Sequence, residues 1–481
     1  MRFKSTLSIG RAALLNFYLM LKRSHACIAL IFCTSAAFAQ EISTSSASTV
    51  ASPVLTPTST LEIPAVDSLG TPALTGSSAT STSLDTAEAE EGFLLPGGYG
   101  FSPLNFTPGQ GLFDRQPLSF STTVQHGYDD NIYSSSGKKG ETQPIKGSQF
   151  TAVSEGVDLL IAQSRVGLSL QANAGAQYYY DRAGDQLTPI GGLSLLFAYK
   201  LTPRAQFSSV INGTYTTQPS LSVLNGLVQS NGKGYLTING KFDLLYLWTR
   251  RISTDTTYTI VNTTYSGSTT SSSDALTQTI GQSVRYLFNP IFTGVAELRA
   301  SQASYGNSIF DSKSYYLLLG PDVMLSRRLS GSLRAGGMMT EYDNSALSND
   351  SSPYVEASAD YILSRLSSVS FSGRYGLNGG NSSSQSSGKE TRLGIGYNQT
   401  FTPKLRGSIA ANYSHQANSS EKNTVSAGGQ DSANLTVGAQ YLLSQKLTLF
   451  ANYTHFEVFN TANPLSENSR NTYYVGATYN Y

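Results

Sequence analysis

The sequence predicts an all-β fold: a transmembrane, antiparallel, up-and-down β-barrel of about 18 strands that follows a disordered N-terminal leader. Three observations predict it. Apolar and polar residues alternate with a period of two over segments of about ten residues, the length of a tilted strand that crosses a bilayer. Short turns and long polar connections alternate along the chain. Only 13% of the residues are charged, yet no segment after the first forty residues has the roughly 20 apolar residues of a membrane helix.

The N-terminal residues 1–39 have the pattern of a secretory signal peptide. Lys22 and Arg23 precede the apolar stretch ACIALIFCTSAAFA, which ends in the small-x-small cleavage site Ala37-Phe38-Ala39. Translation starts at Met1 or at Met20. Cleavage removes both cysteines, Cys27 and Cys33, so the exported chain has no thiol for a disulfide or a metal site. It retains 27 basic and 31 acidic residues.

Residues 40–114 differ in composition from the remainder of the chain. They contain eight acidic residues and no lysine or arginine, and up to Glu91 they are mostly Ser, Thr, Ala and Pro. Such a segment buries too little apolar surface to offset the entropy lost on ordering, so we expect a disordered acidic periplasmic leader. From residue 92 four phenylalanines appear, and this part is an irregular lead-in, a docked linker or a partial plug.

The barrel is expected to span residues 115–481. One alternating segment places Ala433, Leu435 and Val437 on one face and Asn434 and Thr436 on the other. Eight short turns and nine loops require eighteen strands, the first starting near Leu118 and the last ending at Tyr481. Hydrocarbon does not tolerate unpaired sheet edges, so the sheet must close. The predicted turns are Ala162–Arg165, Thr202–Arg204, Thr249–Arg251, Asn289–Pro290, Ser326–Arg328, Ser364–Arg365, Thr402–Lys404 and Ser444–Lys446.

Aromatic residues fall where the two membrane interfaces are expected. Those just before turns are Trp248, Phe288 and Phe401, and those nearer the loops are Tyr178, Tyr180, Tyr315 and Tyr375. Amphipathic rings prefer the headgroup level, so these residues suit the two aromatic girdles of a barrel. A large secreted β protein, such as a fibre or adhesin domain, is the alternative. It explains neither the strand length nor the alternation of short and long connections.

Two motifs resemble those of a known family. The C-terminal YYVGATYNY ends in an aromatic residue, like the signal by which the barrel-assembly machinery recognises outer-membrane barrels. The segment Gly127-Tyr128-Asp129-Asp130-Asn131-Ile132-Tyr133 resembles a signature that ends the first strand in the Putative beta-barrel porin 2 family. The resemblance covers Leu118 to Tyr481. It implies an outer-membrane channel or export barrel and supplies no catalytic residues.

We expect no metal, no cofactor and no catalytic residue. Asp129, Asp130 and Asn131 are adjacent in a strand and point in different directions, whereas calcium requires six or more oxygen ligands. These residues are expected to turn the chain and to place charge at the rim. The histidines of the exported chain lie in no nucleophile motif. They are His126, His415 and His455.

The residues in phase with the polar face are the candidate pore lining. They are Lys241, Asp243, Asp255, Arg285, Glu297, Arg299, Arg334, Glu356, Asp360, Arg374, Arg392 and Arg406. Equal distances from turns on neighbouring strands predict an Arg334–Glu356–Arg374 cluster. The inward residues of segment 166–180 are uncharged, so one side of the lumen should be charged and the other neutral. The arginines either attract anions or form an ion-pair lattice that stiffens the wall.

The expected function is passive diffusion of small polar solutes or ions, with a weak preference for anions. An alternative is the outer-membrane barrel of a surface polysaccharide export or assembly system, whose leader would dock a periplasmic partner. A third hypothesis, a barrel enzyme acting on lipid or protein, is disfavoured by the scarcity of histidine. Outer-membrane lipids are the expected surroundings. No nucleic acid is expected to bind, and the oligomeric state is open.

Overall fold

The computed structural model describes residues 118–138, 144–162, 165–184, 186–222, 226–228, 234–266, 274–306, 311–344, 349–378, 388–418, 429–459 and 467–481. The signal peptide predicted at residues 1–39 and the leader predicted at 40–114 lie outside these residues. Among the residues just given, no helix is long and apolar enough to span a membrane.

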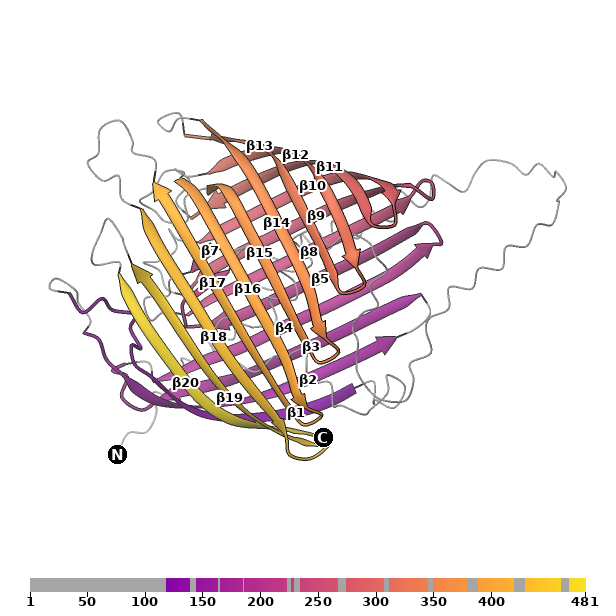
Figure 1. Ribbon diagram of the computed structural model, residues 1–481. Helices are drawn as coiled ribbons and strands as arrows, with labels where there is room; N and C mark the ends of the chain where they lie inside the picture. Colours follow the sequence, from indigo (N-terminus) through magenta and orange to yellow (C-terminus); the bar gives the residue numbers. More distant parts are fainter. Residues whose placement is uncertain are drawn as a thin grey trace, which may run out of the picture. The chain divides into compact units, whose positions relative to one another are not determined.

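Eighteen long strands form one sheet (Figure 1). They are β1 (Leu118–Asp129), β2 (Ser148–Ala162), β3 (Val166–Tyr179), β4 (Leu187–Thr202), β5 (Ala205–Thr216), β8 (Tyr235–Leu247), β9 (Ile252–Tyr265), β10 (Ala275–Asn289), β11 (Phe292–Tyr305), β12 (Ser312–Ser326), β13 (Leu329–Tyr342), β14 (Asp350–Ser364), β15 (Ser367–Asn378), β16 (Gly388–Thr402), β17 (Leu405–Asn418), β18 (Gln430–Leu442), β19 (Leu447–Phe459) and β20 (Asn468–Asn480). Two short strands, β6 (Ser220–Ser222) and β7 (Gly226–Val228), pair only with each other.

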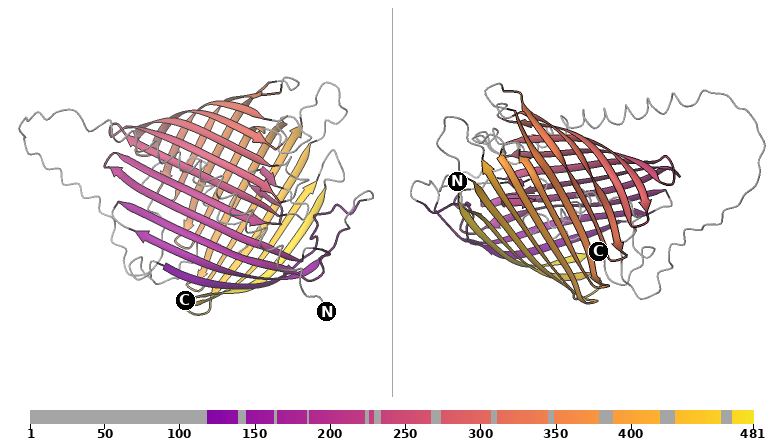
Figure 2. Two further views of the ribbon diagram at one scale, coloured as in Figure 1. Left: turned by 180° about the vertical axis from the view of Figure 1, so that it is seen from behind. Right: turned by 45° about the horizontal axis from the view of Figure 1, so that its top comes forward.

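The sheet closes on itself. Each long strand pairs antiparallel with the next, and β1 pairs with β20, so the first and last strands lie side by side (Figures 1 and 2). Phe120 and Tyr481 exchange backbone hydrogen bonds of 3.3 and 3.0 Å at one end of this seam. The predicted fold class, a closed antiparallel barrel of eighteen strands that begins at Leu118 and reaches Tyr481, is confirmed.

Each fully described short turn is capped by a Ser, Thr or Asn side chain. Between β4 and β5 the Thr202 hydroxyl accepts hydrogen bonds from the backbone N–H groups of Arg204 and Ala205, at 3.2 and 3.0 Å. A side-chain oxygen that accepts from the backbone two or three residues later favours a tight turn. The equivalent residue accepts such bonds in the other fully described turns. These residues are Thr249, Asn289, Ser326, Ser364, Thr402 and Ser444.

The seven predicted turns that are fully described lie where they were predicted. The eighth, between β2 and β3, includes residues 163 and 164, which are outside the described residues. Its flanking strands end and begin as predicted, at Ala162 and Val166.

Each strand has an apolar outer face and a mostly polar inner face. On β13, Leu333 is 43% exposed and faces outward, whereas its neighbour Arg334 is 1% exposed and faces inward. Burying an arginine on the inner face avoids placing its charge in lipid, which costs about 2–4 kcal/mol at mid-depth. Trp248, Phe288 and Phe401, predicted for the interface at the turns, are all exposed.

Two connections on the side of the barrel opposite the turns fold against the inner wall. In the connection between β5 and β8, β6 lies against β17 and β18, and Leu221 packs on Phe456 and Val458 of β19. In the connection between β1 and β2, Ile132 packs within an aromatic cluster on the wall. That cluster contains Phe150, Tyr179, Phe450 and Tyr474. Neither inward contact was predicted from the sequence.

Candidate functional site

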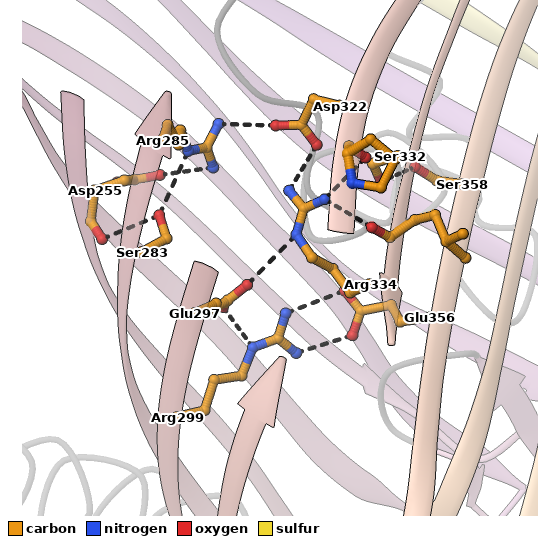
Figure 3. Close-up of polar contacts among 12 residues, drawn as sticks. Asp255, Ser283, Arg285, Glu297, Arg299, Asp322, Ser332, Arg334, Glu356 and Ser358 are labelled. Atoms are coloured by element: carbon orange, nitrogen blue, oxygen red, sulfur yellow. Dashed lines mark hydrogen bonds and ion pairs between the residues drawn. The ribbon is translucent and has the colours of Figure 1, made fainter. Parts of the chain in front are cut away.

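An ion-paired chain of side chains crosses the inner face of β9–β14 (Figure 3). At one end the Arg285 guanidinium contacts Asp255 on β9 at 3.3 Å and Asp322 on β12 at 3.4 Å. The other carboxylate oxygen of Asp322 accepts a hydrogen bond of 2.6 Å from Arg334 on β13. Arg334 also donates to the backbone carbonyls of Pro321 and Leu333. Its guanidinium is thus surrounded by acceptors, which is how a buried charge is stabilised.

The series of ion pairs continues from Arg334 to Glu356. Glu297 lies 3.7 Å from Arg334 Nε, an ion-pair distance, and accepts a hydrogen bond of 2.6 Å from Arg299 Nε. The two terminal nitrogens of Arg299 donate to the two oxygens of Glu356 at 2.9 and 3.1 Å. The Tyr354 hydroxyl donates to Glu356 at 2.6 Å. A bidentate arginine–carboxylate pair of this kind fixes geometry as well as charge.

The predicted Arg334–Glu356–Arg374 cluster forms, but with different partners. The three residues lie opposite one another on β13, β14 and β15, as predicted from their distances to the turns. Glu356, however, pairs with Arg299 from β11, while Arg334 leans towards the carboxylate of Asp322. The Arg374 guanidinium lies 6.0 Å from the centre of the Tyr354 ring. Glu356 thus bonds to a residue three strands away along the wall, and Arg334 bonds to one on the neighbouring strand.

The other predicted residues occupy separate positions on the same wall. Lys241 contacts Asp243 at 3.4 Å, and Arg392 contacts Glu390 at 2.5 Å. Asp360 and Arg406 lie towards the turns, and neither belongs to the chain of ion pairs described above. Six of the predicted residues are thus connected by ion pairs: Asp255, Arg285, Glu297, Arg299, Arg334 and Glu356. The other six lie elsewhere on the same inner face. They are Lys241, Asp243, Asp360, Arg374, Arg392 and Arg406.

The inner face of β8–β17 carries nearly equal numbers of basic and acidic side chains. Seven inward positions are basic: Lys241, Arg285, Arg299, Arg334, Arg374, Arg392 and Arg406. Eight are acidic: Asp243, Asp255, Glu297, Asp322, Asp350, Glu356, Asp360 and Glu390. Of these acidic residues, Asp322, Asp350 and Glu390 were not among the predicted pore lining. The wall is therefore highly charged but nearly neutral in sum.

The opposite part of the wall has a different chemistry. The inner face of β3 carries only uncharged side chains, as predicted. They are Gly167, Ser169, Gln171, Asn173, Gly175, Gln177 and Tyr179. The lumen is thus asymmetric, with a lattice of ion pairs on one side and amides and hydroxyls on the other.

A second buried ion pair closes the seam between β1 and β20. Asp129, at the end of β1, is 0% exposed, and Arg470 on β20 donates to both of its carboxylate oxygens at 2.5 to 3.1 Å. Asp129 also accepts hydrogen bonds from the Asn131 N–H at 3.1 Å and the Tyr179 hydroxyl at 3.3 Å. Sequence reasoning placed Asp129 at the rim but did not find Arg470.

The neighbouring signature residues bind the same seam. Asp130 accepts hydrogen bonds from the backbone N–H and the side-chain amide of Asn471, at 2.7 and 2.6 Å. The Asn131 amide donates to the carbonyls of Ser135 and Ser469, at 2.8 and 2.9 Å. Gly127 has to be a glycine because a Cβ there would lie 2.2 Å from the Tyr473 carbonyl oxygen. The signature residues therefore tie the first strand to the last hairpin.

The three histidines all lie on the outward face, near the loop ends of their strands. His126 contacts the Thr151 hydroxyl at 3.0 Å, His415 contacts Asp431 at 2.7 Å, and His455 contacts Asn471 at 2.9 Å. None of these partners is a serine. Across the described residues, no group of three or more His, Cys, Asp or Glu side chains is arranged to hold a metal ion.

The closed barrel of long strands, with an apolar outside and a polar inside, defines a porin-type channel of the outer membrane. The chain belongs to the Putative beta-barrel porin 2 family, whose model matches residues 118–481. The match covers the whole barrel and confirms the family that the signature residues suggested. No curated protein matches the chain.

Solved structures to which the chain is similar are distant. The outer membrane protein opdK from Pseudomonas aeruginosa has 10% identity and a TM-score of 0.39, over 76% of this chain and 99% of that one. Acinetobacter baumannii OccAB3 has 12% identity and a TM-score of 0.38, over 76% and 99%. Pseudomonas aeruginosa OpdQ has 12% identity and a TM-score of 0.37, over 76% and 97%. These distant structures add no functional information.

Proposed function

We propose that the protein is a channel for passive diffusion of small polar solutes and ions across the outer membrane. The observation that carries the proposal is the polar inner wall of a closed barrel of eighteen strands. Barrels of about 16–18 strands are wide enough to hold an aqueous channel. A row of charged, hydrogen-bonded side chains on the inner face is stable only where water or other polar groups meet it.

The charge balance of the wall bears on ion selectivity. The sequence-based expectation was a weak preference for anions, because arginines dominated the candidate lining. Asp322 and Glu390 provide acidic partners for Arg334, Arg285 and Arg392. Paired charges of opposite sign largely cancel at distances beyond about 8 Å in physiological salt. We therefore propose that the channel selects weakly between small anions and cations.

The role proposed is not catalytic. His126, His415 and His455 face outward and away from the lumen, where a solute would pass. Substituting each histidine by alanine should leave channel conductance unchanged. A loss of transport in any one of the three variants would contradict this assignment.

Single-channel recording in planar bilayers tests the proposal. The refolded protein lacking residues 1–39 is compared with a form that also lacks residues 40–114. Steady openings in both forms are the expected result, and silence in both would contradict the proposal. Conductance only in the shorter form would assign the leader as a plug and would favour the polysaccharide export hypothesis. That hypothesis depends on the leader, which lies outside the described residues.

Reversal potentials in a KCl gradient test the selectivity. The expected value lies close to zero, since the wall carries almost equal numbers of both charges. A strong preference for either ion would show that the ion-pair lattice does not govern permeation.

A further inference from the structure

The uncharged side of the lumen contains two continuous rows of hydrogen-bonding side chains. In the first row, Gln171 on β3, Ser194 on β4, Asn212 on β5 and Asn239 on β8 lie opposite one another. All four point inward, because the large apolar neighbours on these strands, such as Leu193, are exposed on the outer face. Four adjacent strands thus present an amide, a hydroxyl and two further amides side by side.

The second row lies two residues further along each strand. Asn173 on β3 stands opposite Gly192 on β4, Thr214 on β5 follows, and Thr237 on β8 completes the row. We call the two rows together the amide face. Its residues are Gln171, Asn173, Ser194, Asn212, Thr214, Thr237 and Asn239.

Several polar atoms of the amide face have no hydrogen-bond partner within the described part of the chain. They are Gln171 Oε1, Asn173 Oδ1, Ser194 Oγ, Thr237 Oγ1 and Asn239 Oδ1. Ser194 and Thr237 are each only 8% exposed. Buried polar groups are normally paired, and an unmade hydrogen bond is costly. These atoms are buried as they stand, and a change of side-chain rotamer would turn the unpaired groups towards donors in the lumen.

The surroundings of the amide face favour an uncharged occupant. No ionised side chain lies within either row on β3, β4, β5 and β8. Charged neighbours border the rows without belonging to them: Asp158 on β2 stands opposite Gln171, and Lys241 follows Asn239 on the inner face of β8. Within the rows a neutral solute exchanges hydrogen bonds with water for hydrogen bonds with amides and hydroxyls. On the adjoining strands β9–β14, the guanidinium and carboxylate groups of the lattice already bind one another.

The inner face of β3 is also open towards its turn end, about 13 Å along the strand from Gln171. Gly167 lies on the same inner face of β3, four residues from Gln171, and a Cβ placed on it would meet nothing within 4 Å. Neighbouring strands are about 4.8 Å apart, so side chains from two or three strands lie within reach of one small ring-shaped solute.

We propose that the amide face is a binding subsite for uncharged polyhydroxylated solutes, that is, sugars and polyols. This inference rests on the proposed function, because the solute reaches the subsite through the channel. Each hydroxyl of such a solute donates one hydrogen bond and accepts others, which matches a wall of amide and hydroxyl groups. Groups built to bond a solute hydroxyl reject analogues that lack it, so the subsite would prefer polyols to apolar molecules of the same size.

The test measures block of channel current by neutral sugars. The refolded full exported chain is recorded in KCl while glucose, maltose or sucrose is added, and bulk conductivity is corrected for viscosity. Binding appears as a saturable fall in current. Gln171→Leu combined with Asn173→Leu removes two amides and should raise the half-blocking sugar concentration at least about tenfold, since each buried hydrogen bond contributes roughly that much. The single variant Ser194→Ala should show a smaller rise.

Gln440→Leu is the matched control, since Gln440 faces the same lumen from β18, opposite Arg406 and outside the amide face. It should leave sugar block unchanged, and the block in each variant is measured relative to that variant's own KCl conductance. Current without sugar block, or equal block in the double variant, would overturn the inference and leave the channel function intact. Absence of any current would instead contradict the channel function. In that case titration calorimetry of the refolded protein with the same sugars still decides whether the subsite binds them.

Discussion

Replacing Arg470 by methionine tests the seam between β1 and β20. Methionine has a similar length but carries no charge and no donor. The substitution removes three hydrogen bonds to Asp129, at 2.5 to 3.1 Å, and leaves a carboxylate that is 0% exposed. Within the described part of the chain, Asp129 keeps the hydrogen bonds from the Asn131 N–H and the Tyr179 hydroxyl.

The magnitude follows from this burial. Removing one partner of a buried ion pair costs about 3–5 kcal/mol, because the other charge stays buried without compensation. Because two hydrogen bonds to Asp129 remain, we expect Arg470→Met to lower the free energy of unfolding by about 3 kcal/mol, the lower end of this range. With a urea dependence of about 1–3 kcal/mol per molar, the unfolding midpoint should fall by roughly 1–3 M. Combining Arg470→Met with Asp129→Asn should recover part of this loss, since the buried charge is then gone.

The assay is urea unfolding of the barrel in lipid vesicles, followed by the change in gel mobility between folded and heated samples. Lys313→Met is the matched control. Its ion pair with Asp343 is exposed, at 45% and 53%, so its midpoint should not move. An Arg470→Met midpoint equal to that of the wild type would refute the claim that the ion pair holds the seam.

Three further predictions concern single positions on the wall. Gly127→Ala places a Cβ 2.7 Å from the Phe150 ring and should destabilise the barrel by about 1–3 kcal/mol in the same urea assay, whereas Gly167→Ala should have no effect. Glu356→Gln removes the negative partner of Arg299, so the reversal potential in a KCl gradient should move towards anion selectivity. An unchanged potential would argue against a conducting path along this wall. Leu221→Asp should detach the connection between β5 and β8 from β19 and raise single-channel conductance, and equal conductance would show that this contact does not narrow the lumen.

The barrel could be predicted from the sequence because its determinants are local. Alternation with a period of two assigns each side chain to a face, and the capping residues Thr202, Ser326 and Thr402 mark the turns. Strand order in an up-and-down barrel then follows from chain order. The positions of Arg334 and Glu356 opposite each other could be counted from the turns for the same reason.

The partners within the lumen could not be predicted in this way. Arg334 bonds to Asp322 rather than to Glu356 because its side chain turns towards the carbonyls of Pro321 and Leu333, a choice that depends on packing. Asp322 follows Gly320 and Pro321, where the alternating pattern is weak, and so it was not assigned to a face. The inward packing of Leu221 is a contact between distant segments, and a polar loop sequence carries no sign of it.

The bond between Asp129 and Arg470 joins residues 341 positions apart. Neither residue can be satisfied until the last hairpin exists, so the first strand carries an unpaired carboxylate through nearly the whole of synthesis and export. A chain that stops before β20 would have to bury that charge alone in order to close, which the energetics above disfavour. We therefore expect that only a chain made to its final strand gains the free energy of closing the barrel, and that shorter products stay open and are more readily proteolysed.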